Sequence, residues 1–108
     1  AEASGEVVAI GDGVTGWTIG DRATPYGART CGTCPACRAG RDNLCENVQG
    51  VAGFHVDGFA REFANVPARQ LIKVPQNVTF EDAACSTVTF GTVEHMLFDN
   101  AKLQPGET

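Results

Sequence analysis

Four of the five cysteines lie close together in the sequence, and their spacing is the feature best suited to chemistry. Cys31, Cys34, Cys37 and Cys45 form the pattern C-x2-C-x2-C-x7-C. Two residues between cysteines allow a tight turn that brings both thiolates to one ion, and four sulfurs complete a tetrahedron. Zinc prefers such a set, with Zn–S distances of about 2.3 Å, and then has no position left for water or substrate. The pattern predicts a structural zinc site.

An iron–sulfur cluster is the alternative metal for these cysteines, because C-x2-C-x2-C also begins the bacterial ferredoxin pattern. In that pattern the fourth cysteine follows after three residues and precedes a proline. Cys45 instead follows after seven residues and precedes Glu46, which favours zinc over an iron–sulfur or rubredoxin-like electron carrier. Free or disulfide-paired thiols are the ordinary alternative. The odd number of cysteines and the clustering of four of them favour a metal site over a disulfide scaffold.

The segment around these cysteines, residues 30–48, is called the cysteine lobe below. Leu44 and Val48 are its only aliphatic side chains of any size, so it cannot form its own hydrophobic core. Zinc binding contributes on the order of 10–16 kcal/mol in zinc-finger peptides, which is enough to order a loop of this kind. We therefore expect the metal to order the lobe.

The remaining sequence predicts short strands followed by one helix, a mainly β fold with a C-terminal helix. β-branched or alternating apolar runs predict strands at residues 5–10, 22–26, 59–66 and 70–74. Thr79 followed by Phe80-Glu81-Asp82 resembles a capping box and predicts a helix from about residue 80. β-branched residues and a glycine at 87–91 predict an interruption, after which the helix resumes toward Ala101.

A glycine pattern near the N-terminus imitates a dinucleotide-binding loop. Gly11, Gly13 and Gly16 match G-x-G-x-x-G after a predicted strand. That loop requires a helix opening at the turn, whereas Gly20 and Pro25 disfavour a helix there. We interpret the glycines as a turn that connects two strands.

Composition and charge restrict the class of protein. The 108 residues carry 13 acidic and 8 basic side chains, a net charge of −5, and are 43% hydrophobic, which describes one globular domain at most. The basic residues are scattered, so we expect no nucleic-acid partner. No apolar run approaches the roughly 18 residues that a membrane span needs, so we expect a cytoplasmic protein without a membrane partner. The end of the chain, Pro105-Gly106-Glu107-Thr108, is an isolated turn, and we expect a piece of a longer protein, truncated at both ends.

The order of these motifs resembles medium-chain zinc-dependent alcohol dehydrogenases. Essentially all 108 residues share the likeness, which rests on residues 2–11, Gly20-Asp21-Arg22, the cysteine lobe, Gly58-Phe59-Ala60-Arg61-Glu62-Phe63 and Lys73-Val74-Pro75. The resemblance implies a partial GroES-like β-barrel catalytic domain at residues 1–86, including the structural zinc lobe at 30–48. It further implies that residues 87–108 are a helix and turn leading into a Rossmann domain that the chain lacks.

The resemblance also implies remnants of a second, catalytic zinc site. Family members hold that zinc with an early cysteine, a histidine within Gly-His-Glu, and a downstream cysteine or acidic residue. Cys85 matches the downstream ligand and Glu2 matches the glutamate, while Ala1 stands where the histidine would be. Thr89 matches a threonine close to the nicotinamide ring. Taken by itself, Cys85 is more often a small buried apolar side chain. Because a catalytic site needs three protein ligands, we do not expect this chain to bind the catalytic zinc.

The implied activity is hydride transfer between a small-molecule alcohol or carbonyl and NAD(P), with the catalytic zinc acting as a Lewis acid. Catalytic zinc and NAD(P) would belong to the full-length enzyme, for which the resemblance allows a homo-oligomer. The 108-residue chain alone is expected to bind structural zinc and to be inactive. A stand-alone zinc-binding module that interacts with other proteins is the alternative, and it would have to unfold cooperatively as an isolated chain.

Overall fold

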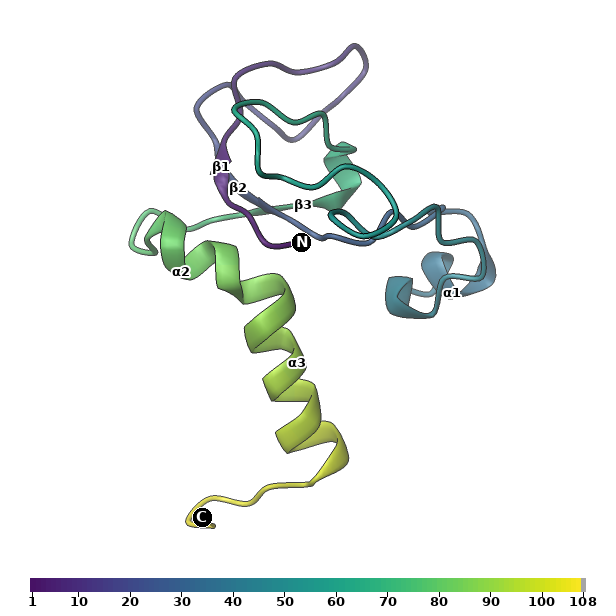
Figure 1. The fold of residues 1–108 in the computed structure, drawn as a ribbon, viewed down its shortest axis with the longest axis vertical. Helices are drawn as coiled ribbons and strands as arrows, with labels where there is room; N and C mark the ends of the chain where they lie inside the picture. The colour runs from purple at the N-terminus through teal and green to yellow at the C-terminus, as the bar shows by residue number, and fades with distance from the viewer. Residues whose placement is uncertain (108) are drawn as a thin grey trace.

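The computed structural model describes residues 1–107, and its centre is a small antiparallel sheet. The sheet contains β1 (Gly5–Glu6), β2 (Arg22–Pro25) and β3 (Leu71–Lys73), in the order β1-β2-β3. The middle strand, β2, pairs with both of its neighbours: Ala23 lies opposite Gly5 of β1 and opposite Lys73 of β3. Figure 1 shows the three strands crossing above the C-terminal helix. Within residues 1–107 the sheet does not close into a barrel.

A long hairpin loop connects β1 and β2, as the glycine pattern predicts. β1 is shorter than the predicted strand 5–10. Backbone pairing between the two segments nevertheless extends one residue beyond it, because the Val7 amide donates to the Asp21 carbonyl and the Gly20 amide donates to the Val7 carbonyl, each at 2.8 Å. No helix opens after Gly11 within the described residues before β2. The interpretation of this segment as a turn between strands is confirmed.

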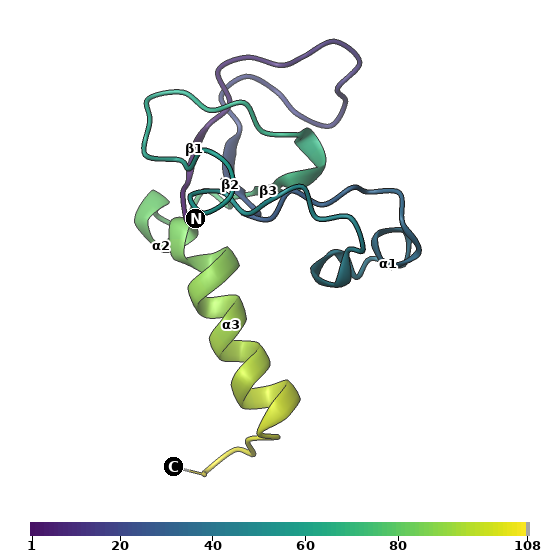
Figure 2. The ribbon, with the colours of Figure 1, turned by 45° about the vertical axis from the view of Figure 1, so that its right-hand side comes forward.

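A continuous helical segment leaves the sheet at residue 80 and projects away from it (Figures 1 and 2). Its parts are α2 (Phe80–Cys85), a π-helical stretch (Ser86–Phe90), α3 (Gly91–Glu94) and a second π-helical stretch (His95–Asn100). Thr79 caps its start, because its hydroxyl accepts the Asp82 amide at 3.1 Å and donates to the Asp82 carboxylate at 2.8 Å. The predicted interruption at 87–91 is a widened π-turn and not a break, so the helix continues through it.

The predicted strand at residues 59–66 is wrong. The segment is irregular, with a local turn in which the Arg61 amide donates to the Phe59 carbonyl at 2.7 Å. The Phe63 side chain, which a strand packed on a core could bury, is 68% exposed. A strand needs a neighbour to satisfy its backbone groups, and none pairs with this segment in residues 1–107.

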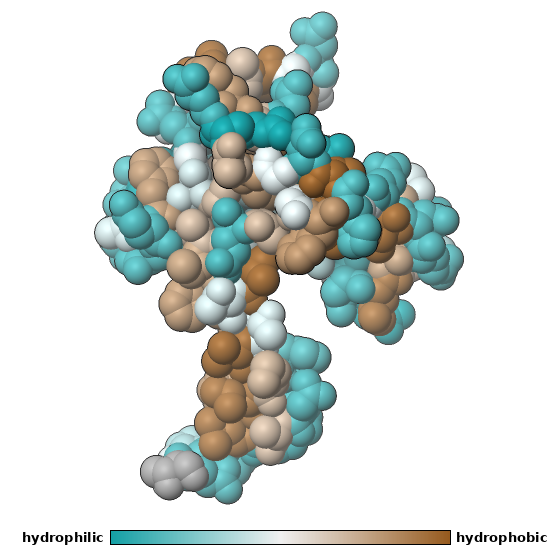
Figure 3. All heavy atoms as spheres, in the orientation of Figure 1, coloured by the Kyte–Doolittle hydropathy of each residue, from teal (hydrophilic) through white to brown (hydrophobic). Residues whose placement is uncertain are grey.

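The buried core is small and lies around β2. Its apolar members are Ala23, Ala52, Val74 and Ala83, whereas Cys34 is buried separately, in the cysteine lobe. Larger apolar side chains of the helical segment are exposed, among them Phe90, Met96 and Phe98; Figure 3 shows the hydrophobic surface that runs along this helix. None of the helices among the described residues has the length and apolar character needed to cross a membrane.

Candidate metal centre

The cysteine lobe extends from one side of the sheet and contains two short helical turns (Figures 1 and 2). These are α1 (Pro35–Arg38) and a 3-10 turn, η1 (Asp42–Leu44). Cys34 caps α1, and Pro35 at the first helical position supplies a backbone angle already suited to a helix. Neither turn buries a residue. The lobe therefore has no hydrophobic core, as its sequence predicts.

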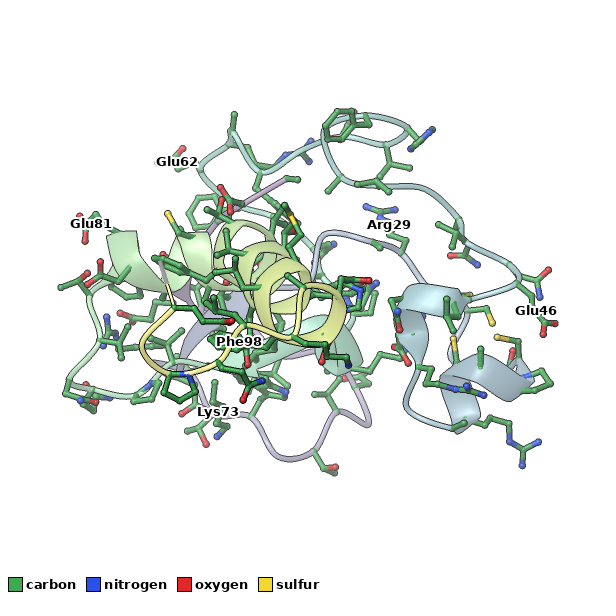
Figure 4. All side chains as sticks on the ribbon, turned by 90° about the horizontal axis from the view of Figure 1, so that it is seen from below. Arg29, Glu46, Glu62, Lys73, Glu81 and Phe98 are labelled. Atoms are coloured by element: carbon green, nitrogen blue, oxygen red, sulfur yellow. The ribbon has the colours of Figure 1, made fainter. Side chains whose placement is uncertain are left out.

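The sulfur atoms of the four lobe cysteines converge. Their Sγ atoms all lie within 4.8 Å of one another, with 4.0 Å between Cys31 and Cys37 and 3.6 Å between Cys31 and Cys45. A tetrahedral ion with Zn–S bonds of about 2.3 Å requires sulfurs about 3.8 Å apart. In Figure 4 these sulfurs gather between the two helical turns, on the side of the lobe where Glu46 is labelled. The cluster is close enough to hold one zinc ion.

Backbone amides point at the sulfurs. Those of Thr33 and Cys34 donate to the Cys31 sulfur at 3.4 and 3.3 Å, and the Cys37 amide donates to the Cys34 sulfur at 3.5 Å. The amide of Thr33, together with the Thr33 side chain and the Cys34 amide, lowers the pKa of the Cys31 thiol to about 5. The Cys37 amide likewise lowers the pKa of Cys34. The lobe therefore stabilises negative charge on the Cys31 and Cys34 sulfurs before any metal binds.

Cys37 has the opposite tendency. Desolvation raises the pKa of its thiol to about 12, and the neighbouring thiols add to the rise. A bound metal cation ionises a coordinating thiol outright. The Cys37 thiolate would therefore form together with the metal complex, as expected when metal binding releases protons.

Two segments join the lobe to the rest of the chain, and they pair with each other. The Arg29 amide donates to the Gly50 carbonyl and the Gln49 amide donates to the Arg29 carbonyl, both at 2.8 Å. Thr30, which precedes the first cysteine, is fully buried. Its hydroxyl and carbonyl are bonded by the Arg69 side chain. The sequence does not predict Arg69 as a site residue, because 39 positions separate it from Thr30.

The structure also places the three residues assigned to the catalytic site. Glu2 Oε1 accepts the Thr89 amide at 2.8 Å and the Thr89 hydroxyl at 2.7 Å. These bonds, from the hydroxyl first and then the amide, lower the pKa of Glu2. Cys85 is half-buried at the end of α2, about one helical turn before Thr89. It does not belong to the sulfur cluster, which is the only group of three or more close metal-binding side chains found in residues 1–107.

Comparison with known proteins defines the class to which this fold and cluster belong. Residues 1–76 match the alcohol dehydrogenase GroES-like domain. The chain therefore belongs to this family, and the resemblance seen in the sequence is confirmed.

Its relatives are dehydrogenases. The chain is 47% identical over 91 residues to an L-threonine 3-dehydrogenase from Idiomarina loihiensis, covering 84% of this chain and 26% of that protein. The enzyme of the same name from Pseudoalteromonas atlantica is 44% identical over the same length. The chain thus spans about a quarter of the length of these relatives.

Solved structures of alcohol dehydrogenases contain the same fold. An NAD-dependent alcohol dehydrogenase superposes with a TM-score of 0.86 at 38% identity, covering 99% of this chain and 31% of that one. An alcohol dehydrogenase from Thermus sp. ATN1 gives a TM-score of 0.84 at 34% identity, covering 98% of this chain and 32% of that one.

Proposed function

We propose that Cys31, Cys34, Cys37 and Cys45 together bind one zinc ion with a structural role. The observation that carries this proposal is the convergence of their four sulfurs within 4.8 Å. Four thiolates fill the coordination sphere of zinc and leave no position for a substrate. Zinc in this site would hold the cysteine lobe in its fold, which has no apolar core to do so.

We further propose that the full-length protein is an oxidoreductase that transfers hydride between an alcohol or carbonyl and NAD(P). The family and the dehydrogenase names of its relatives support this activity. A catalytic zinc would polarise the substrate oxygen, and that zinc and NAD(P) would bind in the full-length enzyme. Residues 1–86 would be part of the catalytic domain and residues 87–108 would lead toward the cofactor domain.

Three residues of this chain are proposed to line that active site. Cys85 would be a ligand of the catalytic zinc, with Glu2 beside the metal and Thr89 near the nicotinamide. The two hydrogen bonds between Glu2 and Thr89 support a common site, because they join the N-terminal segment to the helical segment that carries Cys85. The 108-residue chain alone is proposed to be inactive, since the closed four-thiolate site offers zinc no Lewis-acid role.

The metal proposal is tested with a matched pair of cysteine variants. Cys45→Ala should abolish zinc binding and collapse the NMR dispersion of amides in residues 30–48. Cys85→Ala removes a half-buried cysteine outside the cluster and should leave the zinc content unchanged. A Cys45→Ala chain that keeps a full equivalent of zinc and an ordered lobe would overturn the proposal.

The enzymatic proposal is tested on the full-length protein. Mixed with NAD or NADP and either a simple alcohol or L-threonine, it should form reduced nicotinamide with at least one pair. The 108-residue chain should form none under the same conditions. Activity in the short chain, or none in the zinc-loaded full-length protein with any of these pairs, would contradict the proposal.

A further inference from the structure

One arginine outside the cysteine lobe contacts the backbone next to the first cysteine of the cluster. Arg69 lies in a 3-10 turn, η2 (Ala68–Gln70), that runs directly into β3. Its Nη1 atom donates to the Thr30 hydroxyl at 3.1 Å, and its Nη2 atom donates to the Thr30 carbonyl. Both bonds go to a residue with no exposed surface. The guanidinium therefore bonds both the side chain and the backbone of Thr30, the residue immediately before Cys31.

The same guanidinium lies against the residue that follows Cys31. A Cβ atom built on Gly32 would be 3.3 Å from the Cζ, Nε and Nη1 atoms of Arg69. Gly32 has φ of +73°, a conformation that other residues rarely adopt. The close approach thus uses the absence of a side chain at Gly32, and Arg69 braces the backbone on both sides of Cys31.

Thr30 extends this contact to the segment that carries the fourth cysteine. Its hydroxyl donates to the Asp42 carboxylate at 3.2 Å, and Asp42 begins η1, the turn that ends immediately before Cys45. The Arg69 side chain, from the turn that precedes β3, is therefore connected through Thr30 to the segments that lead to Cys31 and Cys45.

The turn that carries Arg69 is itself fixed to the sheet region. The Tyr26 amide, just after β2, donates to the Gln70 carbonyl at 2.7 Å. The Gln70 side chain donates to the Ala28 carbonyl, and Gln70 is buried. Arg69 thus reaches the lobe from a rigid position, as a residue that orients metal ligands must.

We propose that Arg69 is a positioning residue of the metal centre: through Thr30 and Gly32 it holds Cys31 in the orientation that binds metal, and so slows zinc release. The inference rests on the proposed zinc site. Removing a residue that orients a metal ligand typically lowers the metal affinity about 10- to 100-fold. The planar fork of arginine can bond a hydroxyl and a carbonyl together, and a lysine ammonium cannot reproduce that geometry.

The test measures how fast the zinc-loaded chain transfers its metal to a chromophoric chelator. Arg69→Met, which removes the donors and keeps a long side chain, should release zinc about tenfold faster than the unchanged chain. Arg69→Lys, which keeps the charge, should release it at nearly the same raised rate. Arg61→Met is the matched control, because Arg61 pairs with the exposed Asp57 at 3.0 Å and has no bond to the lobe among the described residues; its release rate should not change.

A double substitution separates positioning from general loss of stability. Thr30→Val removes the hydroxyl and keeps the shape of the side chain. If Arg69 acts through Thr30, the combined Arg69→Met and Thr30→Val chain should release zinc more slowly than the product of the two single effects implies. Cobalt bound in place of zinc should keep its four-thiolate charge-transfer bands in Arg69→Lys but shift the bands that report coordination geometry.

The outcomes are distinguishable. If the unchanged chain binds no zinc, the proposed zinc site fails, and this inference fails with it. If the unchanged chain binds zinc and both Arg69 variants release it at the unchanged rate, the role of Arg69 is refuted while the zinc site stands. Effects of Arg69 and Thr30 that multiply independently would refute it as well. Should Arg69→Met fail to fold, Arg69→Lys decides alone.

Discussion

Glu2 and Thr89 lie 87 positions apart in the sequence and are joined by two hydrogen bonds to one oxygen. The amide and the hydroxyl of Thr89 both donate to Glu2 Oε1, at 2.8 and 2.7 Å. Thr89 is in the π-helical stretch Ser86–Phe90, and its amide donates to a side chain of the N-terminal segment. This contact fixes the start of the chain on the helical segment.

The pH dependence of this contact follows from the lowered pKa of Glu2, whose ordinary value is 4.5. A carboxyl whose pKa is lower in the folded state stabilises that state above its ordinary pKa. The contribution is lost as the pH falls through the lowered value. Thr89→Val removes the hydroxyl, the largest cause of the shift, so the pKa of Glu2 should rise toward 4.5, measured by NMR titration of its carboxyl carbon.

The stability of the same variant provides an independent check. Thr89→Val should lower the thermal midpoint at about pH 7, and the difference from the unchanged chain should shrink as the pH falls through the lowered pKa of Glu2. Thr92→Val is the control, because Thr92 is an exposed threonine of α3. A pKa of Glu2 that is the same in both chains would show that the hydroxyl does not hold the carboxylate.

Thr79 should be required for the start of the helical segment. Its hydroxyl accepts the Asp82 amide at 3.1 Å, which satisfies one of the free donors at a helix N-terminus. Thr79→Ala should destabilise the segment by about 1 kcal/mol, measured by amide hydrogen exchange in α2. Thr79→Ser retains a capping hydroxyl and should restore most of the protection. Equal exchange in Thr79→Ala and the unchanged chain would contradict this role.

Two glycines of the cysteine lobe have nearly the same backbone angle but different surroundings. Gly32 has φ of +73° and Gly40 has φ of +72°, yet only at Gly32 would a Cβ lie close to another group, the Arg69 guanidinium at 3.3 Å. Replacing either by alanine introduces backbone strain of about 1–2 kcal/mol. Gly32→Ala should release zinc faster than Gly40→Ala, because it also displaces Arg69. Equal release rates measured with a chelator would show that the contact does not matter.

Removing zinc should disorder the lobe and spare the sheet. The sheet depends on backbone pairing of β2 with β1 and β3 and on buried Ala23 and Val74, none of which involves the sulfurs. After treatment with a strong chelator, amides of residues 30–48 should lose NMR dispersion while those of β2 and β3 keep it. Collapse of the whole spectrum would mean that the sheet cannot form without the metal.

The cysteine cluster could be predicted from sequence because its geometry is local. Cys31, Cys34 and Cys37 are separated by two residues each, so short turns alone bring their sulfurs together. The cap at Thr79 and the turn after Gly11 are local in the same sense, and both predictions are confirmed. The family resemblance followed from these motifs in their order.

Other features depend on contacts between distant segments. Residues 59–66 alternate as a strand would, but alternation does not show whether a partner strand lies beside them, and in residues 1–107 none does. Arg69 was not predicted as a site residue for the same reason, since its role depends on where η2 places it relative to Thr30. The π-turns in the helical segment were missed because a widened turn and a broken helix have the same β-branched and glycine signal at 87–91.

The four-cysteine zinc site is tested by the metal content per chain, determined by elemental analysis on protein purified without added metal. Reactive thiols are counted on the same protein under native conditions. We expect about one zinc per chain and a single reactive thiol, Cys85, because the other four of the five cysteines would be ligands. Iron in place of zinc, or no metal with all five thiols reactive, would contradict this expectation.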